Sequence, residues 1–188
     1  DATPEMFYHR LTNVLPRFFG IRKMFFLRFV HDPIKGTFDV DKELHLNHKH
    51  HPHGNGIYEH YCRRWISIAL LQELFQLKQA GHPSDLLISA QISHYLNTTD
   101  QYLCFTVARP SYPSPNKNVS VTIGLLIDDE LRAKVHFLND PAIPARDVHT
   151  TCERCSIEDC VERAAEPSIV QKKQQFQQIQ DRLNKLLN

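Results

Sequence analysis

Three cysteines lie close together near the end of the chain, in the segment HTTCERCSIEDC. Cys152, Cys155 and Cys160 have the spacing C-x2-C-x4-C, in which two thiolates converge on one metal centre from a tight turn and a third follows. Three thiolates leave a tetrahedral zinc ion or a cubane iron–sulfur cluster one ligand short. The segment therefore predicts a metal or cluster site whose fourth ligand lies outside this spacing.

Two residues are candidates for the fourth ligand: Cys62, remote in sequence, and His149, just upstream. Four thiolates around a divalent metal, or around a cubane core of charge +2, leave a net charge of about −2 that is costly to bury without cations nearby. Basic residues adjoin the cysteines and could compensate this charge: Arg63, Arg64, Arg154 and Arg163. This pattern favours Cys62, with His149 as the alternative.

The identity of the metal stays open, because four thiolates suit zinc and a [4Fe–4S] cluster equally. An odd total of five cysteines in a chain large enough to form its own core indicates metal binding rather than a disulfide framework. Cys104 lies in an apolar segment without a neighbouring thiol, and we assign it to the core.

A rival metal site lies in the histidine-rich segment 45–60, which also contains the breakers Pro52, Gly54 and Gly56 and reads as a loop. Its closely spaced candidates are His48, His50, His51 and His53. A metalloenzyme built there would need a carboxylate, for which Glu59 and Asp41 are available. The chain has no H-E-x-x-H, no glycine-rich phosphate loop and no G-x-S-x-G, so we expect no enzymatic activity.

The elements that must position these residues follow from periodicity and breakers. An N-cap at Thr3 predicts a helix to about Leu15, closed by Pro16 and Gly20. A second helix is predicted over 58–78. A third follows the cysteines, with a narrow apolar stripe. The apolar stripe of this third helix consists of Phe176, Ile179, Leu183 and Leu187. Strands are predicted at 24–30, 36–46, 86–96, 101–110 and 119–128.

Short polar turns between consecutive strands predict an antiparallel meander. We therefore expect an α+β fold with a mainly antiparallel sheet of about five strands and helices packed on it, comparable with GAF or PAS sensors. Residues 1–148 would form the ligand-sensing domain, and 149–188 a cysteine knuckle and helix packed on the same domain.

Composition restricts the partners. A net charge of +1 argues against whole-chain attraction to nucleic acid, and no apolar run approaches the ~20 residues of a membrane span. We expect a cytoplasmic protein with no membrane partner.

Three segments in order, GNGIYEHYCRRWISI, QYLCFTVARP and HTTCERCSIEDCVERAAEP, resemble the C-terminal domain of the short-chain fatty acyl transcriptional regulators of bacteria. The resemblance covers most of the chain from about Phe25 to Pro167. The family pattern also has a cysteine three residues before a tryptophan, and that cysteine falls on Cys62. The histidine-rich loop and the CRRW step depart from the family pattern.

The resemblance implies a sensor of coenzyme A or its acyl thioesters, with cysteines associated with an iron–sulfur cluster. It also implies that DNA is bound only through an upstream helix-turn-helix domain that this chain does not contain. From the residues, a coenzyme A site needs cations for phosphates and an aromatic slot for adenine. Arg109, Lys117 and Tyr112 could supply these, with Tyr95 and Tyr102 as weaker candidates.

A second hypothesis is a dimerisation or interaction module with a purely structural zinc and no small-molecule ligand. In that hypothesis the C-terminal helix provides the interface of a homodimer.

Overall fold

The computed structural model describes residues 2–46, 56, 58–82, 85–114 and 116–187, and the chain divides into two compact units. Residues 1–51 and 64–148 form the first, which we call the sheet unit. Residues 52–63 and 149–188 form the second, the cysteine unit. The segment before Arg64 thus joins the cysteine segment, although more than 80 residues separate them in the sequence.

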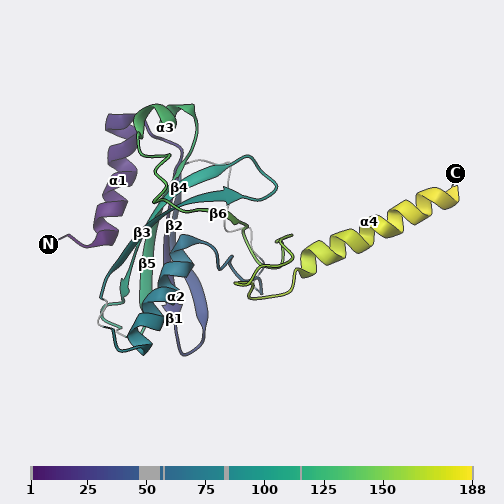
Figure 1. Ribbon diagram of the computed structural model, residues 1–188, viewed down its shortest axis with the longest axis horizontal. Helices are drawn as coiled ribbons and strands as arrows, with labels where there is room; N and C mark the ends of the chain where they lie inside the picture. The colour runs from purple at the N-terminus through teal and green to yellow at the C-terminus, as the bar shows by residue number, and fades with distance from the viewer. Residues whose placement is uncertain (1, 47–55, 57, 83–84, 115, 188) are drawn as a thin grey trace. The chain divides into compact units, whose positions relative to one another are not determined.

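A six-stranded sheet forms the sheet unit (Figure 1). Four of the five strand pairings are antiparallel, and the pairing of β3 with β6 is parallel. The α+β class and the antiparallel meander are therefore confirmed, with six strands where about five were expected. In the sheet, the strands lie side by side in the order β2-β1-β5-β4-β3-β6. In chain order, their bounds are β1 Met24–Asp32, β2 Thr37–His45, β3 Leu87–Tyr95, β4 Gln101–Pro110, β5 Asn118–Leu126 and β6 Ala145–Val148.

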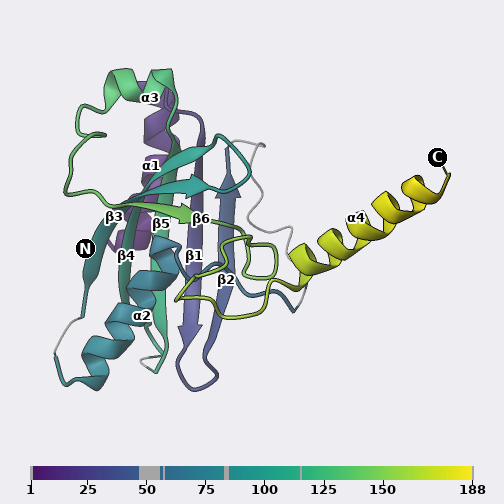
Figure 2. The same cartoon turned by 45° about the vertical axis from the view of Figure 1, so that its right-hand side comes forward.

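The sixth strand, β6, is not among the strands that the sequence predicts. β6 runs beside β3 (Figure 2), and the Ile92 amide donates to the Pro144 carbonyl at 2.9 Å. Four residues with mixed burial carry too little alternation to predict a strand.

The first helix, α1 Pro4–Phe19, begins as predicted, with the Met6 amide donating to the Thr3 hydroxyl at 3.2 Å. It continues past Pro16, where the sequence predicts its end. A proline removes one helical hydrogen bond, but the helix ends only at Gly20, which has a φ of 69°. The left-handed conformation of this glycine provides the C-cap.

The second helix, α2 Ile66–Gln79, is shorter than the predicted 58–78. The prediction was wrong for residues 58–65 because their backbone groups pair elsewhere: the Cys62 amide donates to the Thr150 carbonyl at 3.2 Å. Apolar periodicity in residues 58–65 therefore does not lead to a helix.

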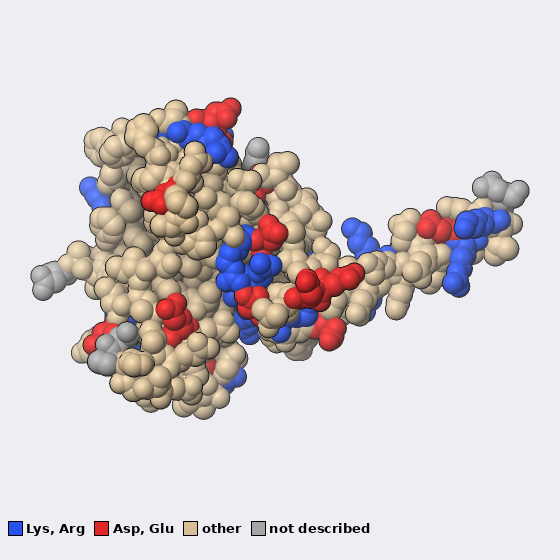
Figure 3. All heavy atoms as spheres, viewed as in Figure 1, with Lys and Arg blue, Asp and Glu red and all other residues tan. Residues whose placement is uncertain are grey.

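Within the described residues, two further helices follow, α3 Asp129–Lys134 and α4 Ser168–Leu187. The α4 helix is predominantly polar, and its side chains from 171 to 186 are exposed, with uncharged surface between the charged groups (Figure 3). No helix in the described ranges is long and apolar enough to cross a membrane.

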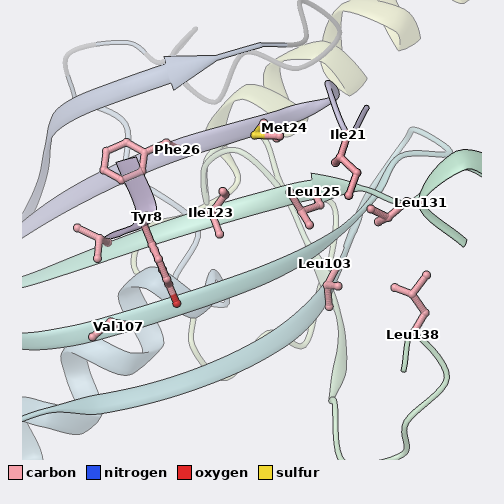
Figure 4. Close-up of a cluster of buried hydrophobic side chains, with 11 residues drawn as sticks. Tyr8, Ile21, Met24, Phe26, Leu103, Val107, Ile123, Leu125, Leu131 and Leu138 are labelled. Atoms are coloured by element: carbon pink, nitrogen blue, oxygen red, sulfur yellow. The ribbon is translucent and has the colours of Figure 1, made fainter. Parts of the chain in front are cut away.

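Helices cover both faces of the sheet. A cluster of buried apolar side chains packs α1 and α3 against one face (Figure 4). On the other face, the Trp65 ring at the start of α2 lies 6.0 Å from the ring of Phe29. The cluster in Figure 4 includes Tyr8, Phe26, Leu103, Ile123 and Leu131.

Candidate metal centre

The cysteine unit is built on a short antiparallel pairing between residues 60–62 and 150–152. Tyr61 and Thr151 form the bridge. On either side of it, the Cys62 amide donates to the Thr150 carbonyl at 3.2 Å and the Cys152 amide donates to the His60 carbonyl at 2.9 Å. The pairing therefore joins the remote cysteine to the first cysteine of the knuckle through backbone hydrogen bonds.

The register of this pairing places Cys62 and Cys152 as diagonal neighbours. Cys62 follows Tyr61 in one segment, and Cys152 follows Thr151 in the other. Both are one residue away from the bridge, so their side chains point to the same face of the pairing. Diagonal neighbours have Cβ atoms roughly 7 Å apart, which is a separation that two ligands of one metal can share. The sequence favours Cys62 as the fourth ligand, and this register is compatible with that preference.

Burial and backbone contacts differ among the four cysteines of the cysteine unit. Cys62, Cys152 and Cys155 are buried, Cys160 is half-buried, and all are free thiols. The Cys155 amide donates to the Cys152 carbonyl at 3.2 Å, which closes the tight turn. The Ala164 amide donates to the Cys152 sulfur at 3.4 Å, so a backbone group of the following segment contacts the first cysteine of the spacing.

The Arg163 guanidinium binds the backbone of the cysteine segment through several hydrogen bonds. One guanidinium nitrogen donates to the Cys152 carbonyl at 3.0 Å, and the other donates to the carbonyls of Cys155, at 3.4 Å, and Ile157. A planar fork with several donors suits this task. Arg163, expected as a charge compensator, thus also fixes the backbone that carries two of the sulfurs.

Arg63 lies among acidic groups of the cysteine unit. Burial lowers the pKa of its guanidinium, while the charges of Cys152, Cys62 and Glu153 oppose this shift. Burial is the larger effect, and the two cysteines are near enough to Arg63 to act on its pKa in the opposite sense. It therefore fits the expected compensating role best among the four arginines.

Arg154 is held by a carboxylate instead. Its Nε and one terminal nitrogen donate to the two oxygens of Glu59 at 2.7 and 2.8 Å. The Thr151 hydroxyl also donates to Glu59, at 2.8 Å. Hydrogen bonding to Arg154 lowers the pKa of Glu59 to about 2. Glu59, which the sequence offers as a catalytic carboxylate, is therefore committed to a structural ion pair.

A second carboxylate, Glu153, ties the same two segments together. It is buried and accepts from the His60 amide at 2.9 Å, and the His60 ring nitrogen Nδ1 lies 2.7 Å from it. Sequence reasoning missed Glu153. The only available signal was its place between two cysteines, which predicts proximity to the centre and not the identity of its partner.

His149, the alternative ligand, uses one ring nitrogen locally. Its Nδ1 accepts from the Thr150 amide at 2.8 Å, which leaves Nε2 for a metal. Burial, together with the charge of Arg154, lowers the pKa of His149 and favours its neutral form. Neutral imidazole is the form that binds metal.

The donor set of the cysteine unit fits zinc or a [4Fe–4S] cluster in chemistry: four thiols, three of them buried, with an arginine coupled to two. Across the described ranges, however, no three His, Cys, Asp or Glu side chains converge closely enough to hold a metal ion. Of the rival histidines, His48, His50, His51 and His53 lie outside the described residues.

Two residues considered for the centre belong to the sheet unit. Arg64 lies there, and its carbonyl accepts from the Gln91 side chain at 3.2 Å. Cys104 is buried on β4, where burial raises the pKa of its thiol to about 12. A thiol with so high a pKa is a packing residue, as the sequence suggests.

The residues considered for coenzyme A lie at two ends of the sheet. Tyr102 begins β4 and Arg109 nearly ends it, so about 23 Å of strand separates them. Tyr95 and Tyr102 are buried, with ring centroids 5.6 Å apart, and burial raises the pKa of Tyr102. These two tyrosines therefore serve the core, and the structure does not bring all five candidates together.

The remaining candidates lie at the other end, around the turn between β4 and β5. Tyr112 is 88% exposed. The charge of Arg109 is among the influences that lower the pKa of Glu5. The Lys117 ammonium lies 3.8 Å from a carboxylate oxygen of Asp32. Because each cation already has a carboxylate nearby, a phosphate would have to compete for it.

A small hollow lies between α2 and the sheet, with a cavity volume of only about 10 Å³. This is smaller than the roughly 300–1,000 Å³ of typical ligand sites. It is lined by Phe25, Leu27, Trp65, Ile66, Ser67, Ser93, Tyr95, Cys104 and Thr122.

Comparison with known proteins gives no relative: no protein-family model matches the chain, and neither the curated proteins nor the solved structures contain a significant match.

Proposed function

We propose that this chain is a regulatory sensor domain of a bacterial transcription factor, in which Cys62, Cys152, Cys155 and Cys160 hold a [4Fe–4S] cluster or zinc. The observation that carries the proposal is the antiparallel pairing of residues 60–62 with 150–152. This pairing gathers all four cysteines into one unit, although Cys62 and Cys152 are about 90 residues apart in the sequence.

Closing so long a loop through a metal would contribute strongly to the stability of the unit. When bound, the metal or cluster supplies cross-linking of the two segments and, in the case of a cluster, sensitivity to oxidation. The chain's own residues prepare for it: Arg163 fixes the knuckle carbonyls, and Arg63 offsets thiolate charge. Loss of the centre would then loosen the cysteine unit, which is a signal that a regulator can transmit.

The ligand part of the proposal concerns the sheet unit. We propose a sensor of GAF or PAS type that binds coenzyme A or a short-chain acyl thioester, with DNA bound by a separate domain. A mainly antiparallel sheet with helices on both faces supports the architecture. The cations near the β4–β5 turn, Arg109 and Lys117, support the phosphate part of the site.

One observation favours the alternative, an interaction module with a structural zinc and no small-molecule ligand. The hollow beneath α2 is too small for a molecule of the size of coenzyme A without rearrangement. In this alternative the centre stabilises the fold and the C-terminal helix contacts a partner.

Thermal unfolding with and without ligand separates the two functions. A ligand that binds only the folded state raises the midpoint by mass action. We expect propionyl-coenzyme A and acetyl-coenzyme A to raise the midpoint, and the Arg109→Ala variant to lose the shift. Absence of any shift with coenzyme A and its thioesters would favour the interaction module.

The nature of the centre is tested separately, by the visible absorption spectrum of anaerobically purified protein. Charge-transfer absorption together with stoichiometric iron and sulfide would identify a cluster, and zinc without such absorption would identify a structural ion.

A further inference from the structure

The C-terminal helix repeats apolar residues every seven positions. Ile169, Phe176 and Leu183 are one heptad apart, and each of the last two is followed three residues later by another apolar residue, Ile179 and Leu186. This is the a and d pattern of a coiled coil, with Lys172 at the first d position.

Four of these five apolar side chains are exposed, and Ile169 is half-buried. Phe176 is 61% exposed, Ile179 56%, Leu183 53% and Leu186 82%. Side chains that recur at a and d over about 25 Å of helix, from Ile169 to Leu186, form a seam that a second helix can cover. A helix lying on a membrane carries a broader apolar face than this two-in-seven stripe.

We propose that α4 pairs with α4 of a second copy of this chain, as an antiparallel two-stranded coiled coil. A symmetric pair uses the same stripe on both copies, so the interface is self-complementary. This inference does not depend on the metal or on the ligand of the proposed function.

Charge decides the orientation. In a parallel pair the d layers match, and Lys172 would meet Lys172 of the other copy in the core of the seam. In an antiparallel pair the a and d layers alternate across the seam. Lys172 then faces Leu183 of the other copy, and Phe176 faces Ile179.

The flanking positions agree with this orientation. In an antiparallel coil the e positions face each other, as do the g positions. Lys173 then lies opposite Gln180 of the second copy, and Gln175 lies opposite Arg182. No like charges face each other across these flanks, and the antiparallel helix dipoles attract.

The oligomeric state tests the pairing. We expect light scattering behind size-exclusion chromatography to give twice the chain mass of 21.9 kDa. Ile179→Glu should raise the dissociation constant by about tenfold or more, because it buries a charge in the seam. The matched control Gln174→Glu places the same charge on the outward face of α4 and should leave the dimer intact.

Folding is checked in the same samples through the fluorescence of Trp65, the single tryptophan, which is buried in the sheet unit. If the folded wild type is monomeric throughout a concentration series, or Ile179→Glu remains as dimeric as the control, the pairing is refuted. Flotation of a monomeric wild type with phosphatidylserine-containing vesicles would assign the stripe to a membrane surface and also overturn it.

The orientation has its own test. Unlabelled wild type is mixed with ¹⁵N-labelled Lys172→Glu protein, and the dimers are weighed by native mass spectrometry. An antiparallel pair, in which position 172 faces Leu183, predicts a statistical distribution. Strong preference for mixed dimers would show that Lys and Glu at position 172 meet, which contradicts the antiparallel arrangement.

Discussion

At the scale of single residues, the cysteine unit depends on polar side chains that the sequence does not single out. Glu59 and Glu153 each accept several hydrogen bonds and join the segment before α2 to the knuckle. Cysteine spacing predicts the knuckle because C-x2-C is a local pattern. The partners of these carboxylates are set by chain pairing over about 90 residues, which no local pattern encodes.

The Glu59–Arg154 ion pair makes the stability of the metal-free protein depend on pH. Arg154 holds the pKa of Glu59 at about 2, below the unfolded value of 4.5, so the stabilisation is complete above pH 4.5 and is lost as the pH falls towards 2. We expect Glu59→Gln to lower the free energy of unfolding at pH 6 by about 1–2 kcal/mol. Calorimetric unfolding at several pH values measures this difference.

The difference between wild type and Glu59→Gln should shrink below pH 4. An exposed acid of the same unit, Glu158, provides the control, since Glu158→Gln should have little effect at any pH. A difference for Glu59→Gln that is equally large at pH 6 and pH 2.5 would contradict the assigned pair.

Arg163 gives a second prediction at this scale. Arg163→Lys keeps the charge but loses the fork that donates to the carbonyls of Cys152, Cys155 and Ile157. We expect a loss of about 1–3 kcal/mol in the metal-free protein and faster labelling of the buried thiols by a disulfide reagent. The exposed Arg132→Lys serves as control. Unchanged labelling of Cys152 and Cys155 would show that Arg163 does not hold the loop.

At the scale of elements, periodicity predicts the sheet better than the boundaries of the helices. β1, β3, β4 and β5 follow the predicted segments closely, and in β1, β4 and β5 apolar residues lie on two buried faces. The segment 58–65 has helical periodicity but pairs with residues 150–152 instead. Tertiary pairing overrides local propensity there, as it does for the short β6.

A glycine in the central strand supplies a prediction at this scale. Gly124 lies directly opposite Phe25, and a Cβ atom there would clash with the Phe25 ring. We expect Gly124→Ala to lower the free energy of unfolding by about 1–3 kcal/mol through overpacking. Denaturant unfolding followed by Trp65 fluorescence measures the loss.

The second variant Phe25→Leu isolates the cause. Phe25→Leu replaces the ring by a shorter side chain. In this background, Gly124→Ala should lower the free energy of unfolding clearly less than in the wild type, because the two positions are coupled. Additive effects of the two substitutions would mean that the ring is not the obstacle.

At the scale of the whole molecule, the chain consists of a sheet unit and a cysteine unit, and residues 52–63 belong to the second. Composition and spacing predict the α+β class and the cysteine knuckle. They do not predict that Glu59, His60 and Cys62 leave the helix to join the knuckle. Nor do they place the coenzyme A candidates, because Tyr95 and Tyr102 are as suitable for a core as for a ligand site.

The central claim is that Cys62 completes the ligand set of Cys152, Cys155 and Cys160. It is tested most directly by the metal content per chain after anaerobic purification, measured for wild type, Cys62→Ser and the core control Cys104→Ser. We predict that Cys104→Ser retains the zinc or iron of the wild type and that Cys62→Ser loses most of it. Full metal content in Cys62→Ser, with loss in His149→Ala, would contradict the claim.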